Sequence, residues 1–341
     1  MRLALIGSDA DALEVALAAA RSAGHQLVWA FDLGRHAAAV RAAAPGIQVA
    51  EHWEGLLSGA VAEAVIVGRG GDDEVRADQL RKLVQANVPL LISHPIHASM
   101  LLYYELDMIR QESNSVMLPF PSSRSHPVVA RLAELFATDR SSGLGGLEQL
   151  VIERSLGQRN RRAVLDQFVR DTELARAVCS ELTSVTGMSS GGTDHESSYA
   201  NLGVQMSGPS GVLVRWSVGP AQTGPDQTAP HQTGPAHTGP PGRFIWIGSR
   251  GKAILEVPAD RSAWTLDTPA DAGWKRQTFA DWNPANEALA RLADAIAGRA
   301  VRPSWVDAAQ AMELADAVEQ SLERGRLVQL HFGGPSEQGT L

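Results

Sequence analysis

Residues 3–32 read LALIGSDADALEVALAAARSAGHQLVWAFD, and this stretch decides the fold that the rest of the chain follows. It opens with an unbroken apolar run at 3–6, which is typical of a strand buried on both faces. An alanine- and leucine-rich segment with one apolar helical face comes next. A second apolar run occupies 27–31. The pattern predicts a strand, a helix and a second, parallel strand.

The turn after the first strand resembles a nucleotide-binding loop in part. Gly7 breaks the apolar run, Ser8 and Asp9 are good helix N-cap residues, and Asp32 stands 25 positions after Gly7. That spacing is close to the one expected for an acidic group on a nucleotide ribose. A dinucleotide motif G-x-G-x-x-G has glycines where this chain has Asp9 and Ala12. Because a carboxylate repels a pyrophosphate, dinucleotide binding through this loop stays open at this point.

Composition sets limits on the classes of function. The 341 residues suffice for two domains, and 44% apolar with 20% charged residues describes an ordinary soluble globular protein. A net charge of −8 argues against nucleic acid or an anionic membrane as a partner. A single cysteine, Cys179, excludes an internal disulfide framework. Without a secretory signal or an apolar run of ~20 residues, the expected location is cytoplasmic.

Apolar runs and helical patterns keep alternating through the first third of the chain. Strands are predicted at 47–49, 64–67, 89–92 and 115–118, with helices between them. This rhythm predicts a parallel, doubly wound sheet whose ligands lie beyond the carboxyl ends of the strands. The residues expected to bind a nucleotide cofactor at that rim are Gly7, Ser8, Asp9, Asp32, Arg35, Gly68, Arg69 and Ser93.

Several of these side chains have a plainer interpretation. Asp32 is either a ribose contact or an ordinary turn residue, and Arg35 is either a 2′-phosphate contact favouring NADP or an exposed arginine. Arg69 is either an anion contact or a surface charge. His94 and His97 form an H-x-x-H pair, but no third ligand accompanies them, so no metal site is expected.

From about residue 122 the pattern changes to strands joined by short turns. This change predicts an α+β second domain, 122–332, with a mostly antiparallel open sheet, after a nucleotide-binding domain at 1–121. Its predicted strands are 148–155, 197–207, 211–218, 243–248, 252–257 and 327–331, and its predicted helices are 128–136, 164–179, 284–297 and 305–324.

A Thr-Gly-Pro repeat at 220–242 is predicted to be a solvated loop, because glycine and proline at this density do not build a core. It is either a partner-binding arm or a tolerated expansion. The tail 333–341 is predicted to be frayed.

Three segments carry a family resemblance. Residues 87–95, NVPLLISHP, are similar to a strand that ends in Glu-Lys-Pro, and Arg124 with Pro127 matches an R-x-x-P pair. Residues 166–173, DQFVRDTE, stand where the same family has D-x-G-x-H-x-x-D. In this order and spacing, over 3–330, the chain resembles the Gfo/Idh/MocA family of NAD(P)-dependent oxidoreductases, which act mostly on sugars and polyols.

The resemblance implies NAD or NADP as cofactor, with Arg124 as a substrate-binding residue. The family lysine and histidine, which handle the proton that accompanies hydride transfer, correspond here to His94 and Arg170. A neutral histidine accepts or donates a proton near pH 7, whereas arginine can only orient or stabilise negative charge. Asp166 is retained, either as an acid/base or as an ion-pair partner of Arg170.

Two functions follow. In the first, the protein is an oxidoreductase acting on a sugar-like small molecule, with His94, Asp166 and Arg170 as catalytic residues. In the second, it is a catalytically degenerate relative that binds a nucleotide or sugar, or serves as an assembly subunit. In either case the resemblance implies a homodimer or homotetramer formed through the C-terminal sheet. The choice between NAD and NADP stays open.

Overall fold

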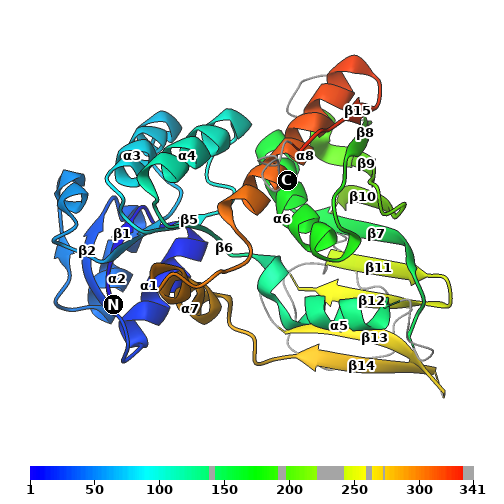
Figure 1. Cartoon of the computed structure of the whole chain (residues 1–341), viewed down its shortest axis with the longest axis horizontal. Coiled ribbons are helices and arrows are strands. Elements are labelled where there is room, and N and C mark those ends of the chain that lie inside the picture. The colour runs from blue at the N-terminus through cyan, green and yellow to red at the C-terminus, as the bar shows by residue number, and fades with distance from the viewer. Residues whose placement is uncertain (138–142, 191–196, 221–241, 259–262, 272, 333–341) are drawn as a thin grey trace, which may run out of the picture. The chain divides into compact units, whose positions relative to one another are not determined.

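The computed structural model describes residues 1–137, 143–190, 197–220, 242–258, 263–271 and 273–332 (Figure 1). These residues belong to two compact units. Unit 1 comprises Met1–His126 and Asn283–Met312, and unit 2 comprises Pro127–Trp282 and Glu313–Leu341. The predicted repeat loop, except for its two end residues, and the predicted tail lie outside the described residues.

Unit 1 is built on a six-stranded sheet with the order β3-β2-β1-β4-β5-β6. All five neighbouring pairs are parallel, which confirms the predicted doubly wound sheet. The strands are β1 (Arg2–Ile6), β2 (Gln26–Phe31), β3 (Gln48–Val49), β4 (Ala64–Val67), β5 (Leu90–Ser93) and β6 (Met117–Phe120). The strand order reverses between β1 and β4, where Ile6 pairs with Val67. Ligands of such sheets bind at this reversal.

Helices cover both faces of this sheet, with α3 and α4 on one face and α1 and α7 on the other (Figure 1). The α-helices are α1 (Ala10–Arg21), α2 (Ala37–Ala43), α3 (Asp73–Gln85), α4 (Met100–Ser113) and α7 (Pro284–Ile296). Three short 3-10 turns are η1 (Gly34–His36), η2 (Glu54–Ser58) and η3 (Ser123–Ser125). The alanines on the inner face of α1 are fully buried. Such small side chains let a helix lie close to the strands beneath it.

The two compact units place α7 differently from the predicted domain division. Its sequence was assigned to the second domain at 122–332, but the segment clusters with unit 1. Ala285, Ala288, Leu289 and Leu292 of α7 share one apolar cluster with the buried residues of β1 and α1. The apolar face of α7 therefore completes a core whose other buried members lie between residues 3 and 120 of the chain.

Unit 2 holds a nine-stranded sheet with the order β14-β13-β12-β11-β7-β10-β9-β8-β15. Its strands are β7 (Leu147–Leu156), β8 (Ser184–Ser189), β9 (Leu202–Ser207), β10 (Leu213–Pro220), β11 (Gly242–Gly248), β12 (Gly251–Val257), β13 (Trp264–Ala270), β14 (Gly273–Phe279) and β15 (Val328–Gln329). Among the strands of unit 2 that the structure describes, only β7 and β10 pair in parallel, so the mostly antiparallel prediction is confirmed.

Three strands of unit 2 were not predicted, namely β8, β13 and β14. β14 reads GWKRQTF and is exposed over nearly its whole length, so it lacks the apolar alternation by which strands are recognised. The predicted strand 197–207 is instead the 3-10 turn η4 (Ser197–Asn201) followed by β9. The remaining helices are α5 (Pro127–Leu135), α6 (Arg161–Cys179) and α8 (Trp305–Arg324). No helix within the described ranges is long and apolar enough to cross a membrane.

Candidate functional site

The loops that follow β1 and β4 pack against each other at the reversal of strand order. Gly7 has a φ of +70°, and a Cβ placed on it would lie 2.7 Å from the Gly68 carbonyl oxygen. A Cβ on Gly68 would lie 2.7 Å from the Cβ of Ala12 in α1. Both positions therefore require glycine, because any side chain would push the two loops apart.

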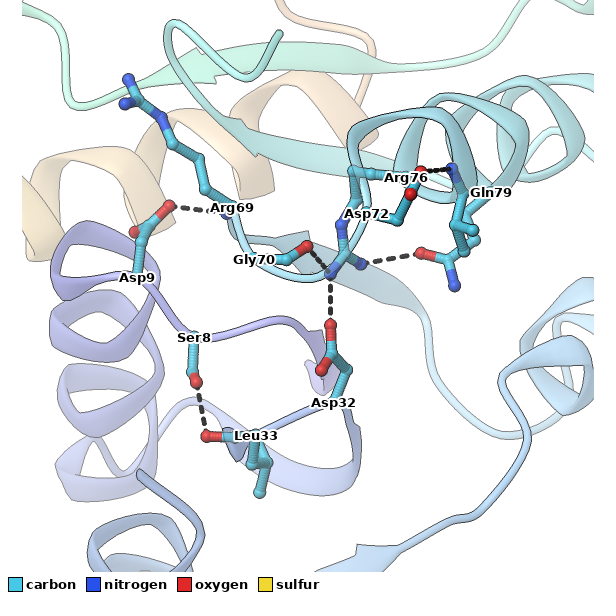
Figure 2. A network of polar contacts seen from close by, with 10 residues as sticks. Ser8, Asp9, Asp32, Leu33, Arg69, Gly70, Asp72, Arg76 and Gln79 are labelled. Atoms are coloured by element: carbon cyan, nitrogen blue, oxygen red, sulfur yellow. Dashed lines mark hydrogen bonds and ion pairs between the residues drawn. The ribbon is translucent and has the colours of Figure 1, made fainter. Parts of the chain in front are cut away.

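The Asp9 carboxylate joins these two loops. Oδ1 accepts a hydrogen bond from the backbone N–H of Ala12 at 2.8 Å, so Asp9 is the N-cap of α1. Oδ2 accepts a hydrogen bond from the backbone N–H of Arg69 at 2.7 Å. Figure 2 shows the carboxylate turned from the start of α1 toward the loop after β4. Nearby, the Ser8 hydroxyl donates to the Leu33 carbonyl at 2.6 Å.

A buried arginine holds Asp32 at the end of β2. Nη2 of Arg76 donates to Oδ2 of Asp32 at 2.7 Å and to the Gly70 carbonyl at 3.1 Å, and Nη1 donates to Gln79 at 2.8 Å (Figure 2). Burial lowers the pKa of the Arg76 guanidinium, and the Asp32 carboxylate opposes that shift. Arginine keeps its proton at any working pH, so Asp32 has a permanent counter-ion.

Asp32 nevertheless keeps a solvent-facing surface. Its side chain is 35% exposed, compared with 4% for Arg76. Its backbone has a φ of +56°, which is uncommon outside glycine and is tolerated best by aspartate and asparagine. Arg35 is exposed in η1, where its Nε lies 3.2 Å from Nε2 of its neighbour His36. The predicted phosphate contact of Arg35 stays a prediction.

His94 lies in an aromatic cluster at the end of β5. The side chain is 1% exposed, and its Nδ1 lies 3.1 Å from the Tyr103 hydroxyl oxygen. That oxygen also accepts from the Ile96 backbone N–H at 2.8 Å, so the arrangement suits a Tyr103 hydroxyl that donates to Nδ1. The Tyr103 ring stacks on Trp305, with the two centroids 4.9 Å apart. The neighbouring Ser93 is also buried.

Arg124 makes an ion pair within unit 1. Its Nη1 donates to Oδ1 of Asp307 at 2.6 Å, in the first turn of α8. Oδ2 of Asp307 accepts from the Ser304 backbone N–H at 2.8 Å and from its hydroxyl at 2.9 Å. Because this carboxylate fixes the guanidinium, the described contacts assign Arg124 a structural role. Its predicted contact with substrate stays a prediction.

Asp166 and Arg170 are both half-buried residues of α6, one helical turn apart in unit 2. His94 belongs to unit 1. The predicted catalytic set therefore draws on both units, and its assembly into one site stays a prediction.

A buried polar cluster around Asp171, next to Arg170, was not predicted from the sequence. Nη2 and Nε of Arg154 donate to the two Asp171 oxygens at 2.5 and 2.8 Å. The Trp216 indole N–H and the Gln167 amide donate to the same carboxylate at 2.8 and 2.9 Å. Four donors therefore hold this one buried carboxylate in a fixed position. The sequence pattern of α6 does not indicate that Asp171 bonds to Arg154 of β7 and Trp216 of β10.

Among the residues that the structure describes, no three His, Cys, Asp or Glu side chains are grouped to hold a metal ion. Of the predicted H-x-x-H pair, His97 accepts from the Ser99 backbone N–H through Nδ1 at 2.9 Å.

Neither family models nor curated proteins match this chain. Solved structures do match it. A myo-inositol dehydrogenase from Corynebacterium glutamicum is 19% identical, with a TM-score of 0.70 over 97% of this chain and 99% of the other. An oxidoreductase from Agrobacterium radiobacter in complex with NAD+, L-tartaric acid and magnesium is 12% identical, with a TM-score of 0.71 over 96% and 98%. GenD2 from gentamicin A biosynthesis, in complex with NAD, is 17% identical, with a TM-score of 0.71 over 97% and 96%.

These similar structures are dehydrogenases and oxidoreductases of the Gfo/Idh/MocA type. The chain therefore has the two-part fold of these enzymes over nearly its whole length, and the predicted resemblance is confirmed at the level of the fold.

Proposed function

We propose that this protein is an NAD(P)-dependent oxidoreductase that transfers hydride to or from a hydroxyl group of a sugar- or polyol-like substrate. Two of the similar structures were solved with NAD+ or NAD bound, and they share the fold over more than nine tenths of both chains. The single observation that carries the proposal to this chain is Asp32, an acidic side chain at the end of β2 and beside the strand reversal.

The ribose end of a dinucleotide fits these residues. Arg76 contacts Oδ2 of Asp32 and fixes the carboxylate, while about a third of the side chain stays exposed. A carboxylate held this way accepts hydrogen bonds from vicinal hydroxyls without a large loss of side-chain entropy. The diphosphate end fits less well, because the Asp9 carboxylate lies at the first turn of α1.

A bound nicotinamide cofactor would supply or accept the hydride. The accompanying proton can be held by His94, whose Nδ1 is within hydrogen-bonding distance of the Tyr103 hydroxyl. The stacked Tyr103 and Trp305 rings fix the orientation of that hydroxyl. Arg170 can orient a hydroxyl or an anion but cannot exchange its proton, so Asp166 is the remaining acid/base candidate on α6.

A second candidate function is a binding or assembly subunit that no longer turns over substrate. The observation that favours it is Asp9, which places a negative charge where the cofactor would place another. The sugar-like substrate, the homodimer or homotetramer and the cytoplasmic location are proposals from the sequence that accompany either function.

Titration with NADH and NADPH tests the choice. We expect saturable binding, seen as a change in nicotinamide fluorescence, and an NADH affinity about tenfold weaker in Asp32→Asn because the ribose hydroxyls of NADH lose a charged acceptor. Asparagine tolerates the positive φ at this position, so the loop geometry is retained. Asp78→Asn is the matched control, since it removes an exposed carboxylate from the adjacent helix α3.

The two candidate functions give different results in this titration. Binding of either cofactor together with oxidation of a polyol supports the enzyme. Saturable binding without turnover of any polyol favours the second candidate. Absence of binding up to millimolar NADH and NADPH refutes the oxidoreductase.

A further inference from the structure

The Asp9 carboxylate makes the contacts that a bound phosphate group would make at the start of a helix. The N-terminal N–H groups and the dipole of a helix favour an anion at this end. Asp9 supplies that anion from the chain itself, with one oxygen on Ala12 N–H and the other on Arg69 N–H. One protein carboxylate thus neutralises both the first turn of α1 and the loop after β4.

We propose that Asp9 is a specificity-determining residue that stands in for the cofactor's diphosphate and weakens the binding of dinucleotides. The inference rests on the proposed function, because it concerns the same cofactor site. A diphosphate entering the strand reversal meets a fixed negative charge and competes with it for the same backbone donors. The nucleoside part of the ligand meets no such charge from Asp9.

The surrounding packing holds Asp9 in place. A Cβ placed on Gly68 would lie 3.3 Å from the Asp9 backbone nitrogen, which is tighter than ordinary van der Waals contact, so the two loops lie too close together for a side chain at position 68. Arg76 fastens the loop after β4 a second time, through the Gly70 carbonyl and Asp32. Moving the Asp9 side chain away therefore breaks its bond to Arg69 while the loop stays where it is.

Two substitutions separate the charge of Asp9 from its volume. Asp9→Asn keeps an N-cap side chain of the same size and removes the charge, whereas Asp9→Gly also opens the space and recreates the glycine of the dinucleotide motif. The matched control is Asp72→Asn, which neutralises the N-cap carboxylate of α3, where Asp72 accepts from Glu74 N–H at 2.8 Å.

The ligands are ADP-ribose, which carries the diphosphate, and adenosine, which lacks it, with NADH as the complete cofactor. We expect Asp9→Asn and Asp9→Gly to bind ADP-ribose and NADH at least about tenfold more tightly than the wild type does. Calorimetric titration measures these affinities. Adenosine affinity stays the same in all variants, and Asp72→Asn binds ADP-ribose as the wild type does.

Equal ADP-ribose affinity in wild type and Asp9→Asn overturns the inference, as does an equal gain for adenosine or no ADP-ribose binding by any variant. Different results would refute the proposed function. If Asp9→Asn gains ADP-ribose affinity but the wild type neither binds NADH nor oxidises a polyol, the inference stands without the enzyme. If wild type and Asp9→Asn bind NADH equally well, the enzyme stands without the inference.

Discussion

At the N-cap of α1, an aspartate and a glycine favour different properties of the same turn. The side-chain bond from Asp9 to Ala12 stabilises the start of the helix by about 1 kcal/mol relative to a residue without a capping group. Glycine at this position loses the side-chain bond, at a cost of only about a few tenths of a kcal/mol because glycine is itself tolerated at an N-cap, and it leaves room for a ligand's diphosphate. Asp9 caps the helix and joins it to the loop after β4, and we propose that it thereby lowers the affinity for an anion.

A second single-residue effect concerns the buried His126, which is 2% exposed after η3. Burial lowers its pKa from 6.5 to about 3. In the unfolded chain the His126 imidazole takes up a proton as the pH falls through 6.5, but in the folded chain it stays neutral down to about pH 3. Between pH 6.5 and about pH 3 the unfolded state therefore binds more protons than the folded state, so the free energy of unfolding decreases as the pH falls. At pH 5, His126 alone lowers the free energy of unfolding by about 2 kcal/mol relative to neutral pH.

Urea unfolding at pH 7 and pH 5 measures this effect. His126→Gln should lose less stability between the two pH values than the wild type does, because its side chain does not titrate. His52→Gln, at an exposed histidine, is the control. An identical loss in wild type and His126→Gln would contradict the assignment.

Among the elements of unit 2, the Arg154–Asp171 pair connects β7 to α6, and Trp216 adds β10 to the same carboxylate. Arg154→Met leaves the Asp171 charge buried with its counter-ion removed. We expect this change to lower the free energy of unfolding by about 3–5 kcal/mol. The measurement is chemical denaturation of the full chain, followed by the fluorescence of its tryptophans.

The control is the double variant Arg154→Met with Asp171→Leu, which removes both charges. Replacing a whole buried ion pair by apolar residues costs much less than breaking it, so the double variant should be more stable than Arg154→Met alone. A single variant within about 0.5 kcal/mol of the wild type would show that the pair contributes little.

The same elements show how far a sequence alone reaches. The strand 64–67 is an apolar run between turn residues, and β4 has those bounds. β14 is polar and lies at the sheet edge, so nothing in its composition separates it from a loop. Likewise Gly7 and Asp32 were predicted as site residues from their spacing, but Arg76 was not, because its partner Asp32 lies 44 residues away. Local patterns predict elements, whereas ion pairs depend on how the elements pack.

At the scale of the whole molecule, unit 1 is assembled from two distant parts of the chain. The β1 and α1 residues that form its core are joined by α7, which follows all the strands of unit 2 except β15. Residues 1–126 alone therefore lack part of their own apolar core. The stability of the candidate cofactor site therefore depends on a helix whose sequence was predicted to belong to the other domain.

Substitutions within α7 test this dependence directly. Leu292 is fully buried in the unit 1 core, and Leu292→Ala should lower the free energy of unfolding by about 2–5 kcal/mol through the cavity it leaves. Ile296, one turn later, is 41% exposed, so Ile296→Ala should stay within about 0.5 kcal/mol of the wild type. Hydrogen exchange locates the effect: amides of β1 and α1 should lose protection in Leu292→Ala, while those of β7 and β11 keep theirs. If protection falls in β7 and β11 instead, α7 stabilises unit 2, as the predicted second domain at 122–332 implies.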